Sequence, residues 1–364
     1  MADTMALNIV INQLKKLLSQ NQKLRQAMVT RLASNAIDNP DPLTNPVRSL
    51  EDLFRWFDRF LTAMPWMGLY PETPAGAQAA RLQNTGAQPV GTAREPRALP
   101  EARPQNLLHR IDQSTGYAYY LFGDLQFEPQ IAQWLKLYNR TWAEHLNSSQ
   151  SWNDEHYQLV KADPAFELNG DKYESPDNWH CWNDFFARRL SSATPPPQVA
   201  EGLTFPWQKI NNNTLDIKTA RIENITDLLG DSPYKKQFEN GLFTHITLDI
   251  HNYHRFHSPV SGSIIDIQDI DGQLTAGGKI IWDKQQHKYR YEQLDNIGFQ
   301  MIEKRVAIVI EKKDTRLLAI IPIGVAQVGS IQLADGIAVG NAVRQGQELG
   351  RFLFGGSDVI VLTN

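Results

Sequence analysis

The chain has 364 residues, of which 41% are hydrophobic and 10% aromatic, and its formal net charge is −4. This length and composition predict a buried core and more than one compact region. The 36 basic residues are neither in excess over the 40 acidic ones nor gathered into long runs, so the sequence predicts no nucleic-acid partner. The single cysteine, Cys181, excludes a disulfide framework and a cysteine-based zinc site, and it fits a reducing compartment.

The N-terminal segment predicts a helix. Apolar positions recur at helical spacing from Leu7 to Ala33, with Lys and Arg between them, and the segment lacks the basic start and small-residue cleavage site of a signal peptide. The longest uncharged apolar stretch, Leu317–Leu333, is broken by Pro322, Gly324 and Gly329 and predicts strands. We therefore expect a cytoplasmic protein without a transmembrane segment. Peripheral membrane contact through Leu7–Ala33, which is basic and amphipathic, stays open as an alternative.

Three further stretches predict helices with aromatic faces. Ser49–Met64 begins with a serine cap and places Asp52 in the first turn, and Glu128–Ser148 and Ser175–Ser192 repeat the apolar spacing. Aromatic stripes of this kind indicate core packing rather than a ligand site. Between them lies Pro71–Pro104, which is rich in Pro, Ala and Gly and predicts a flexible segment.

The pattern changes after the proline run Thr194–Pro197. Short segments rich in β-branched residues, separated by Gly, Asp and Asn, follow from about Glu201 to the C-terminus and predict strands. Helices first and strands second predict an α+β fold.

Two histidines stand out in the stretch Tyr253–Pro259, where His254 and His257 lie three residues apart. On a strand end they would point to different faces or be separated by a turn, and no carboxylate or cysteine set at metal-ligand spacing accompanies them. His245 and His251 lie nearby in the sequence. The residues alone leave a structural role, a metal site and acid–base chemistry open.

A second candidate is the serine in Phe354–Val359. Gly355 and Gly356 directly before Ser357 allow backbone angles that other residues avoid, which would expose the serine at a sharp bend before a strand. A hairpin turn is the simpler interpretation of the same residues.

Taken together, these stretches resemble a known family. Tyr253–Gly262 and Gly346–Leu362 resemble the phosphatidylserine decarboxylase family, and Glu303–Ile310 and Pro322–Ile331 match its strands in the same order. Trp182–Leu190 resembles the helix that precedes its catalytic domain. The resemblance implies a helical N-terminal region over residues 1–165, with the flexible segment at 71–104, followed by a catalytic domain of this family over residues 166–364.

The N-terminal half, including Arg110–Phe122, resembles the extended members of the family, among them the fungal L-tryptophan decarboxylases. These act on a free amino acid rather than on a phospholipid. The resemblance therefore implies a carboxy-lyase that acts on a free L-amino acid, with aromatic ones favoured, and releases CO2 and the amine. A phosphatidylserine decarboxylase that makes phosphatidylethanolamine, and a binding homologue that never cleaves, remain alternatives. The sequence makes no prediction of the oligomeric state.

Family members are made as proenzymes, and the resemblance implies site residues by position. Ser357 would attack the carbonyl of Gly356, and the resulting ester would eliminate to leave a pyruvoyl group at the new N-terminus, with no requirement for PLP or a metal. His257 would be the general base for the serine, and His254 would assist decarboxylation. The pyruvoyl carbonyl would form a Schiff base with the substrate amine and act as the electron sink.

The sequence departs from the family pattern in two places. Glu201 stands where the family has the aspartate of its catalytic triad, so the carboxylate is kept on a stem that is one methylene longer. Only eight residues, Ser357–Asn364, follow the expected cleavage point, and this tail is shorter than is usual in the family.

Overall fold

The structure is a computed structural model. It describes residues 2–38, 40, 45–61, 121–162, 164–217, 220–248, 251–272, 278–283, 288–293, 299–324, 330–354 and 357–364. The chain divides into two compact units, Met1–Tyr157 with Ala276–Leu294, and Gln158–Thr275 with Asp295–Asn364. The expected boundary between residues 165 and 166 stays a prediction.

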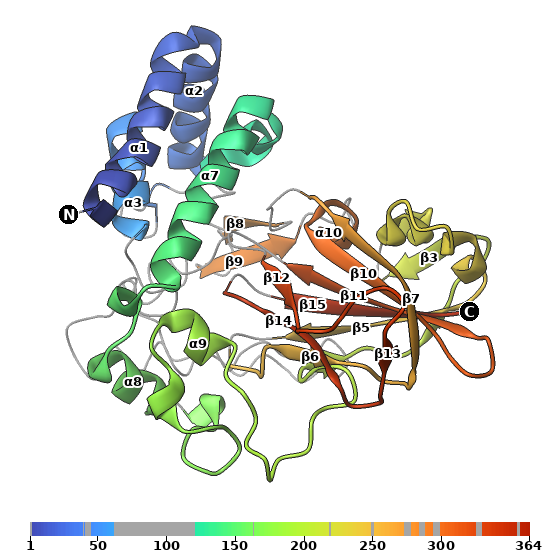
Figure 1. Ribbon diagram of the computed structural model, residues 1–364. Helices are drawn as coiled ribbons and strands as arrows, with labels where there is room; N and C mark the ends of the chain where they lie inside the picture. Colours follow the sequence, from blue (N-terminus) through green and yellow to red (C-terminus); the bar gives the residue numbers. More distant parts are fainter. Residues whose placement is uncertain are drawn as a thin grey trace. The chain divides into compact units, whose positions relative to one another are not determined.

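The first unit is mainly helical. Helices α1, α2, α3 and α7 lie side by side in it (Figure 1). Its described elements are α1 (Ala2–Gln20), α2 (Gln22–Asp38), α3 (Leu50–Phe60), the 3₁₀ turns η1 (Gly123–Phe127) and η2 (Ser149–Ser151), α7 (Pro129–Leu146), and an antiparallel hairpin of β8 (Gly278–Asp283) and β9 (Lys288–Gln293).

Aromatic side chains form the core of the helical unit, as the sequence predicts. The rings of Phe57 on α3 and Trp134 on α7 meet edge to face at 5.1 Å, and Tyr138 packs on Phe57 at 4.8 Å. The polar ends of these rings are also satisfied, because Trp134 Nε1 donates to the Val10 carbonyl at 2.9 Å and Tyr138 Oη to the Phe57 carbonyl at 3.1 Å. The predicted cap is confirmed, since Ser49 Oγ accepts from the Asp52 amide at 3.1 Å.

The second unit is built on antiparallel sheets, so the predicted α+β fold is confirmed. Within the described residues, eight strands form one sheet in the order β1-β5-β15-β11-β10-β7-β13, with β2 also pairing with β5, and a smaller sheet has the order β12-β14-β6. The strands are β1 (Leu203–Thr204), β2 (Gln208–Lys209), β3 (Thr214–Ile217), β4 (Ala220–Glu223), β5 (Leu242–Leu248), β6 (Arg255–His257), β7 (Gly262–Ile270), β10 (Arg305–Glu311), β11 (Leu317–Gly324), β12 (Ile331–Leu333), β13 (Ala342–Val343), β14 (Glu348–Phe352) and β15 (Ser357–Thr363).

Short helical segments complete the second unit. They are α8 (Asp154–Lys161), at which the two units divide, η3 (Pro164–Phe166), η4 (Pro176–Asn178), α9 (Trp182–Phe186), η5 (Ile225–Leu229), η6 (Lys235–Phe238) and α10 (Phe299–Ile302). Leu228, Leu229 and Phe238 of η5 and η6 are buried in one apolar cluster with Ile321 of β11 and Ile360 of β15.

The last strand of the chain occupies an interior position in the large sheet. Figure 1 shows β15 between β11 and β5, and each residue from Ser357 to Thr363 is paired with both neighbours. Val359, Ile360, Val361 and Leu362 are all buried. This burial on both faces explains why the sequence of the strand is a continuous apolar run instead of an alternating one.

The prediction of a single helix over Ser175–Ser192 is wrong in the length of the helix. The segment forms η4 and then α9, which spans only Trp182–Phe186. Cys181 precedes α9 as its N-cap residue, and the Asp184 carboxylate accepts from the His180 amide at 3.0 Å, which fixes the start of the helix. Beyond Ala187 the chain turns into an extended bridge to Tyr173, so tertiary pairing overrides the helical periodicity. Cys181 is buried.

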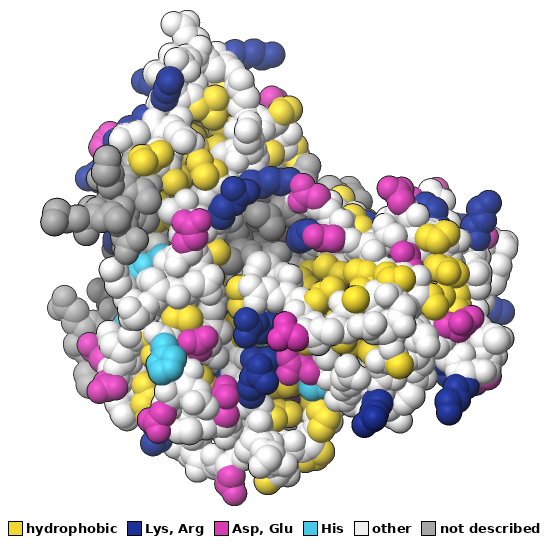
Figure 2. Space-filling model, in the orientation of Figure 1, with side chains coloured by type: hydrophobic (Ala, Val, Ile, Leu, Met, Phe, Trp, Pro, Cys, Tyr) yellow, Lys and Arg dark blue, Asp and Glu magenta, His cyan; other side chains and the backbone are white. Residues whose placement is uncertain are grey.

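The expected flexible segment Pro71–Pro104 lies outside the described residues. Among the helices of the described part, none is long and apolar enough to cross a membrane. On the face drawn in Figure 2, basic and acidic side chains lie interspersed.

Candidate functional site

His257 lies at the end of β6 with both ring nitrogens engaged. Its backbone N–H donates to the Val199 carbonyl at 2.7 Å. Nδ1 lies 3.0 Å from the Gly346 carbonyl oxygen, and Nε2 lies 3.0 Å from Tyr253 Oη. Because a carbonyl can only accept, Nδ1 carries the proton, and the lone pair of Nε2 accepts from the tyrosine hydroxyl. When the ring is neutral, these contacts fix the tautomer that a general base requires.

Burial favours the same protonation state. The His257 side chain is buried, and desolvation lowers its pKa below the ordinary value, whereas the Gly346 carbonyl and the Glu348 carboxylate act in the opposite direction. Gly346 reaches the imidazole from a turn in which its φ is +80°, a conformation that favours glycine.

His254 is completely buried and differently placed. Its ring stacks on Phe186 at a centroid distance of 3.7 Å and an interplanar angle of 25°. Neither of its ring nitrogens has a hydrogen-bond partner among the described residues. Burial, and then the Arg188 guanidinium, lower the pKa of His254 well below its ordinary value, so the ring is neutral. Two unsatisfied nitrogens in a buried place are costly, and they mark a position where a further polar group can bind.

His254 is fixed next to the segment that leads to Ser357. The Phe352 amide donates to the His254 carbonyl at 2.9 Å, and the Phe354 ring packs edge to face on Phe186 at 5.4 Å. The Phe354 amide donates to Asn183 Oδ1 at 3.1 Å. These contacts hold the chain in place three residues before the serine.

The expected cleavage site itself is described only in part. Gly355 and Gly356 lie outside the described residues, and for Ser357 only the backbone is described. Ser357 opens β15, where it is paired with Gly324 of β11 on one side and Leu248 of β5 on the other. The predicted strand after the serine is thereby confirmed.

Glu201 does not contact His257, the histidine that a triad carboxylate would orient. Its carboxylate forms an ion pair with Lys172 Nζ at 2.9 Å and accepts from Asn252 Nδ2 at 3.4 Å. Since the ring of His257 is occupied by Tyr253 and Gly346, the structure does not bring Glu201 onto this histidine. The role of Glu201 stays a prediction.

Sequence reasoning missed two members of this site. Tyr253 stands inside the motif beside His254, and its position in the stretch could have indicated it. Arg188 is fully buried, donates to the His251 carbonyl at 2.5 Å and to Tyr173 Oη at 3.2 Å, and lies 4.3 Å from the centre of the Tyr173 ring. No local signal in the sequence distinguishes this arginine from the exposed Arg189 next to it.

The residues of the site fit the expected pyruvoyl group, which would form from residue 357. A ketone oxygen accepts hydrogen bonds, and a neutral imidazole offers one N–H for that purpose. The unpartnered nitrogens of His254 supply such a donor beside the segment that ends at Ser357. Within the described residues, no three His, Cys, Asp or Glu side chains gather into a group that could hold a metal ion.

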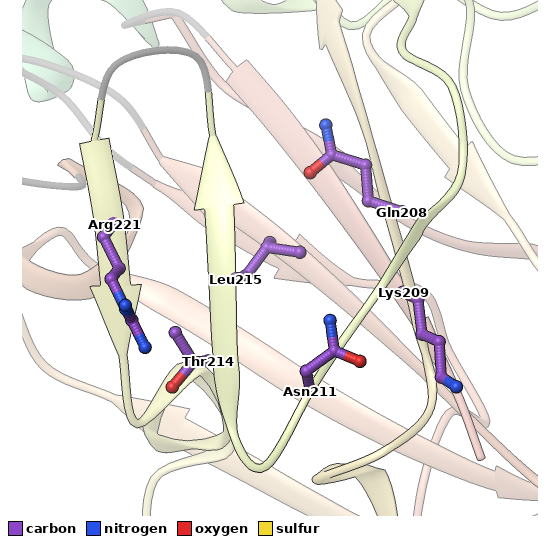
Figure 3. A pocket seen from close by; sticks show the side chains of 6 residues that line it. All are labelled: Gln208, Lys209, Asn211, Thr214, Leu215 and Arg221. Atoms are coloured by element: carbon purple, nitrogen blue, oxygen red, sulfur yellow. The ribbon is translucent and has the colours of Figure 1, made fainter.

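A pocket of about 560 Å³ lies elsewhere in the same unit, lined by Gln208, Lys209, Asn211, Thr214, Leu215 and Arg221. Figure 3 shows Gln208, Asn211 and Leu215 pointing toward one another. Gln208 pairs with Phe243 on β5, whereas Ser357 pairs with Leu248 at the other end of that strand, roughly 17 Å away at the rise of a strand. None of the predicted site residues lines this pocket.

Comparison with known proteins identifies relatives of two kinds. Rice (Oryza sativa subsp. japonica) phosphatidylserine decarboxylase proenzyme 2 is 28% identical over 205 residues, which cover 53% of this chain and 31% of the relative. The L-tryptophan decarboxylase of Psilocybe cyanescens is 26% identical over 259 residues, covering 60% of this chain and 58% of the relative. The phosphatidylserine decarboxylase proenzyme of Fusobacterium nucleatum is 26% identical over 206 residues, which cover 54% of this chain and 64% of the relative.

The chain thus spans less than two thirds of the length of each of these relatives. The family model for phosphatidylserine decarboxylase matches residues 182–364, which include α9, both histidines and the whole of β15. On this match, the chain belongs to the phosphatidylserine decarboxylase family.

Proposed function

We propose that the chain is a pyruvoyl-dependent carboxy-lyase that makes its own prosthetic group by cutting itself between Gly356 and Ser357. The observation that carries the proposal is the buried, neutral His254 beside the segment that leads to Ser357, with a second buried histidine of lowered pKa, His257, three residues further along the chain. His257 has a lone pair held by a displaceable hydroxyl, and neither nitrogen of His254 makes a hydrogen bond of ordinary geometry within the described residues, although the Asn252 backbone acts to raise its pKa. A base and an unsatisfied donor are the two groups that self-cleavage and decarboxylation require.

In the proposed self-cleavage, Ser357 Oγ attacks the Gly356 carbonyl carbon while its proton passes to His257 Nε2. The peptide C–N bond breaks, and the released nitrogen takes a proton, which leaves an ester between the two residues. Removal of the Ser357 α-proton then breaks the Cβ–O bond of the ester, and Gly356 becomes a free carboxylate. One water hydrolyses the remaining enamine after it has tautomerised, so that ammonia leaves and a ketone stays on residue 357.

Tyr253 has a defined part in this proposal. Its hydroxyl donates to His257 Nε2 at 3.0 Å, so the base is oriented but its lone pair is occupied. The serine must displace this hydroxyl before proton transfer, and Nδ1 keeps its bond to the Gly346 carbonyl at 3.0 Å. A backbone carbonyl thus orients the imidazole in the way that a carboxylate does in other triads.

His254 would act in the second reaction. The pyruvoyl group, once formed, supplies an electron sink for the electrons released with CO2. His254, neutral and stacked on Phe186, would hold a proton for transfer at the reacting carbon or oxygen, in a place from which water is excluded by Phe186 and Phe354.

A free aromatic L-amino acid is the favoured substrate. Phe186 stacks on His254, Phe354 packs on Phe186, and Trp182 packs on Phe354, so aromatic rings that could make edge-to-face contacts with an aromatic substrate lie on one side of His254. The similarity to the tryptophan decarboxylase covers 60% of this chain, compared with 53% for the rice phosphatidylserine enzyme. Phosphatidylserine remains the second candidate, because the family model bears its name.

Self-cleavage predicts two chains in the purified protein. We expect a large chain that ends at Gly356 and a small one of eight residues, Ser357–Asn364, whose N-terminus is blocked to Edman sequencing. Intact mass spectrometry checks this, and the Ser357→Ala variant should remain a single chain. Only full-length protein after prolonged incubation would exclude self-cleavage.

Substitutions should separate the roles of the two histidines in cleavage and in decarboxylation. We expect His257→Ala to block cleavage, since a general base contributes about 10²- to 10⁴-fold. His254→Ala should be cut at a near-normal rate and lose a comparable factor in CO2 release. Cleavage rates by gel and turnover by ¹⁴CO2 release check both, and the opposite pattern would mean that the two roles are exchanged.

Glu201 requires a matched control, because its carboxylate also pairs with Lys172. If the carboxylate supports cleavage, Glu201→Gln should slow it by up to about 10⁴, the loss seen when a triad carboxylate is removed, while Glu201→Asp should be tolerated. Lys172→Met breaks the same ion pair, together with the pair between Lys172 and Glu167, but keeps the Glu201 carboxylate. Equal slowing in Glu201→Gln and Lys172→Met would assign the effect to the ion pair alone.

Both histidines should make stability depend on pH. Their folded pKa values lie below the ordinary value of 6.5, so the unfolded chain binds more protons as the pH falls below it. The free energy of unfolding should therefore fall by about 1.4 kcal/mol per pH unit for each histidine, between pH 6.5 and the lowered pKa. Urea unfolding of the uncut Ser357→Ala chain from pH 7.5 to 5.5 (roughly one unit either side of the ordinary pKa) measures it. Adding His254→Gln should remove part of the slope, while His257 and His156, whose pKa values burial also lowers, keep their contributions. An unchanged slope would contradict a buried neutral His254.

The substrate class is tested by CO2 release from carboxyl-labelled tryptophan, tyrosine and phenylalanine, and from phosphatidylserine in detergent micelles, without added PLP. We expect release from at least one free amino acid, and inactivation by borohydride, which reduces a ketone. Release from the lipid alone would make the chain a phosphatidylserine decarboxylase, and activity that depends on added PLP would contradict the cofactor.

A further inference from the structure

The residue directly after Ser357 is a buried acid. Asp358 is 1% exposed, although it is the only charged residue in the strand Ser357–Thr363. Its carboxylate lies 3.4 Å from His245 Nδ1 through each oxygen, and it accepts from Gln300 Nε2 at 3.2 Å and from Thr247 Oγ1 at 3.5 Å. Nothing in the proposed chemistry uses this cluster, which we call the Asp358 cluster.

The donors come from two different elements. His245 and Thr247 lie on β5, the strand beside β15, and Gln300 lies on α10. The His245 ring is itself fixed, because it stacks on Phe205 at 4.0 Å with an interplanar angle of 10°. A buried carboxylate that is removed from water needs such donors, and a partner lost from the cluster leaves the others unsatisfied.

The position of the cluster matters once the chain has been cut. Before cleavage, Gly356 ties β15 covalently to the preceding residues. Afterwards the strand that begins at Ser357 is held by noncovalent contacts alone, and the first residues of a free chain end fray unless they are tied down. The ketone at Cα of residue 357 would be joined to the Asp358 nitrogen through a single amide carbonyl, so fraying at Asp358 would move the reacting group.

The opposite end of the small chain has its own attachment. The Leu317 amide donates to Asn364 Oδ1 at 2.8 Å, and the Asn364 amide donates to the Leu317 carbonyl at 3.3 Å. Between the two ends, Val359–Leu362 contribute buried apolar side chains, which resist dissociation but allow a strand to slip or fray at its tip. At the tip that carries residue 357, the Asp358 cluster adds side-chain contacts to the backbone pairing of Ser357 and Asp358 with β5 and β11.

We propose that the Asp358 carboxylate, held by His245, Thr247 and Gln300, anchors the cut end of β15 and so keeps residue 357 in its reacting position after self-cleavage. This inference rests on the proposed self-cleavage. Asp358 is a positioning residue, since its carboxylate acts through the backbone of the strand and touches neither substrate nor ketone. Cleavage itself does not need the anchor, because the intact chain supplies a covalent one.

The test compares Asp358→Asn and Asp358→Ala with Thr363→Ala, which changes the same short chain at its far end. All three should be cut at rates within about threefold of wild type. After gel filtration, intact mass spectrometry should find the small chain retained in full in wild type and Thr363→Ala, but at least tenfold depleted in Asp358→Ala. CO2 release per retained small chain should fall at least tenfold in Asp358→Ala and less in Asp358→Asn, which keeps one acceptor oxygen.

Melting temperatures distinguish the anchor from a general loss of stability. Each Asp358 variant is also made in the uncut Ser357→Ala chain, where the covalent tie remains. The anchor predicts a clearly smaller loss of melting temperature in the uncut chain than in the cut chain. Equal losses in both would overturn it. If Asp358→Ala fails to fold, Asp358→Asn and His245→Phe, which removes a donor on the neighbouring strand, carry the same comparison.

The failures of the two proposals look different. A wild-type chain that is never cut overturns the proposed function and this inference together. A wild-type chain that is cut, with Asp358 variants that retain the small chain and turn over normally, overturns the anchor alone.

Discussion

The proposed cleavage site depends on one structural constraint: the last strand of the chain, β15, is an interior strand of the large sheet. Backbone pairing with β5 on one side and β11 on the other fixes the register of every residue from Ser357 to Thr363. The strand is paired on both sides, and its side chains from Val359 to Leu362 are buried. The peptide bond directly before β15 can therefore be cut while the strand stays in the sheet. A self-cutting protein needs this property, because the product of the cut must stay where the reaction takes place.

The two histidines of the motif differ because the surrounding elements treat them differently. His257 at the end of β6 is oriented from outside its own strand, by the Gly346 carbonyl and the Tyr253 hydroxyl. His254 is buried against Phe186, and its ring nitrogens make no hydrogen bond of ordinary geometry to the residues that the structure describes. Desolvation lowers the pKa of both, but it leaves one as an oriented base and the other as an unsatisfied donor. Spacing alone does not separate these roles.

The sequence predicts much of the local structure and little of the site's connections. The Ser49 cap, the aromatic faces of α3 and α7, and the strand after Ser357 follow from patterns within a few residues. The partner of His257 does not, because Gly346 is 89 residues away and reaches the ring through a turn. Glu201 could be recognised by its place in the motif, but its ion pair with Lys172 depends on tertiary packing. Ser175–Ser192 has helical periodicity, yet the bridge between Leu190 and Tyr173 ends the helix early.

The central claim is that residue 357 becomes a ketone through chemistry that the chain performs on itself, and a tandem mass spectrum of the small chain tests it most directly. A pyruvoyl group has lost the nitrogen of Ser357, so the account predicts a small chain lighter by the mass of ammonia than the peptide Ser357–Asn364, with the difference located at its first residue. A small chain with a free serine at its N-terminus would show ordinary proteolysis at this position and would contradict the account.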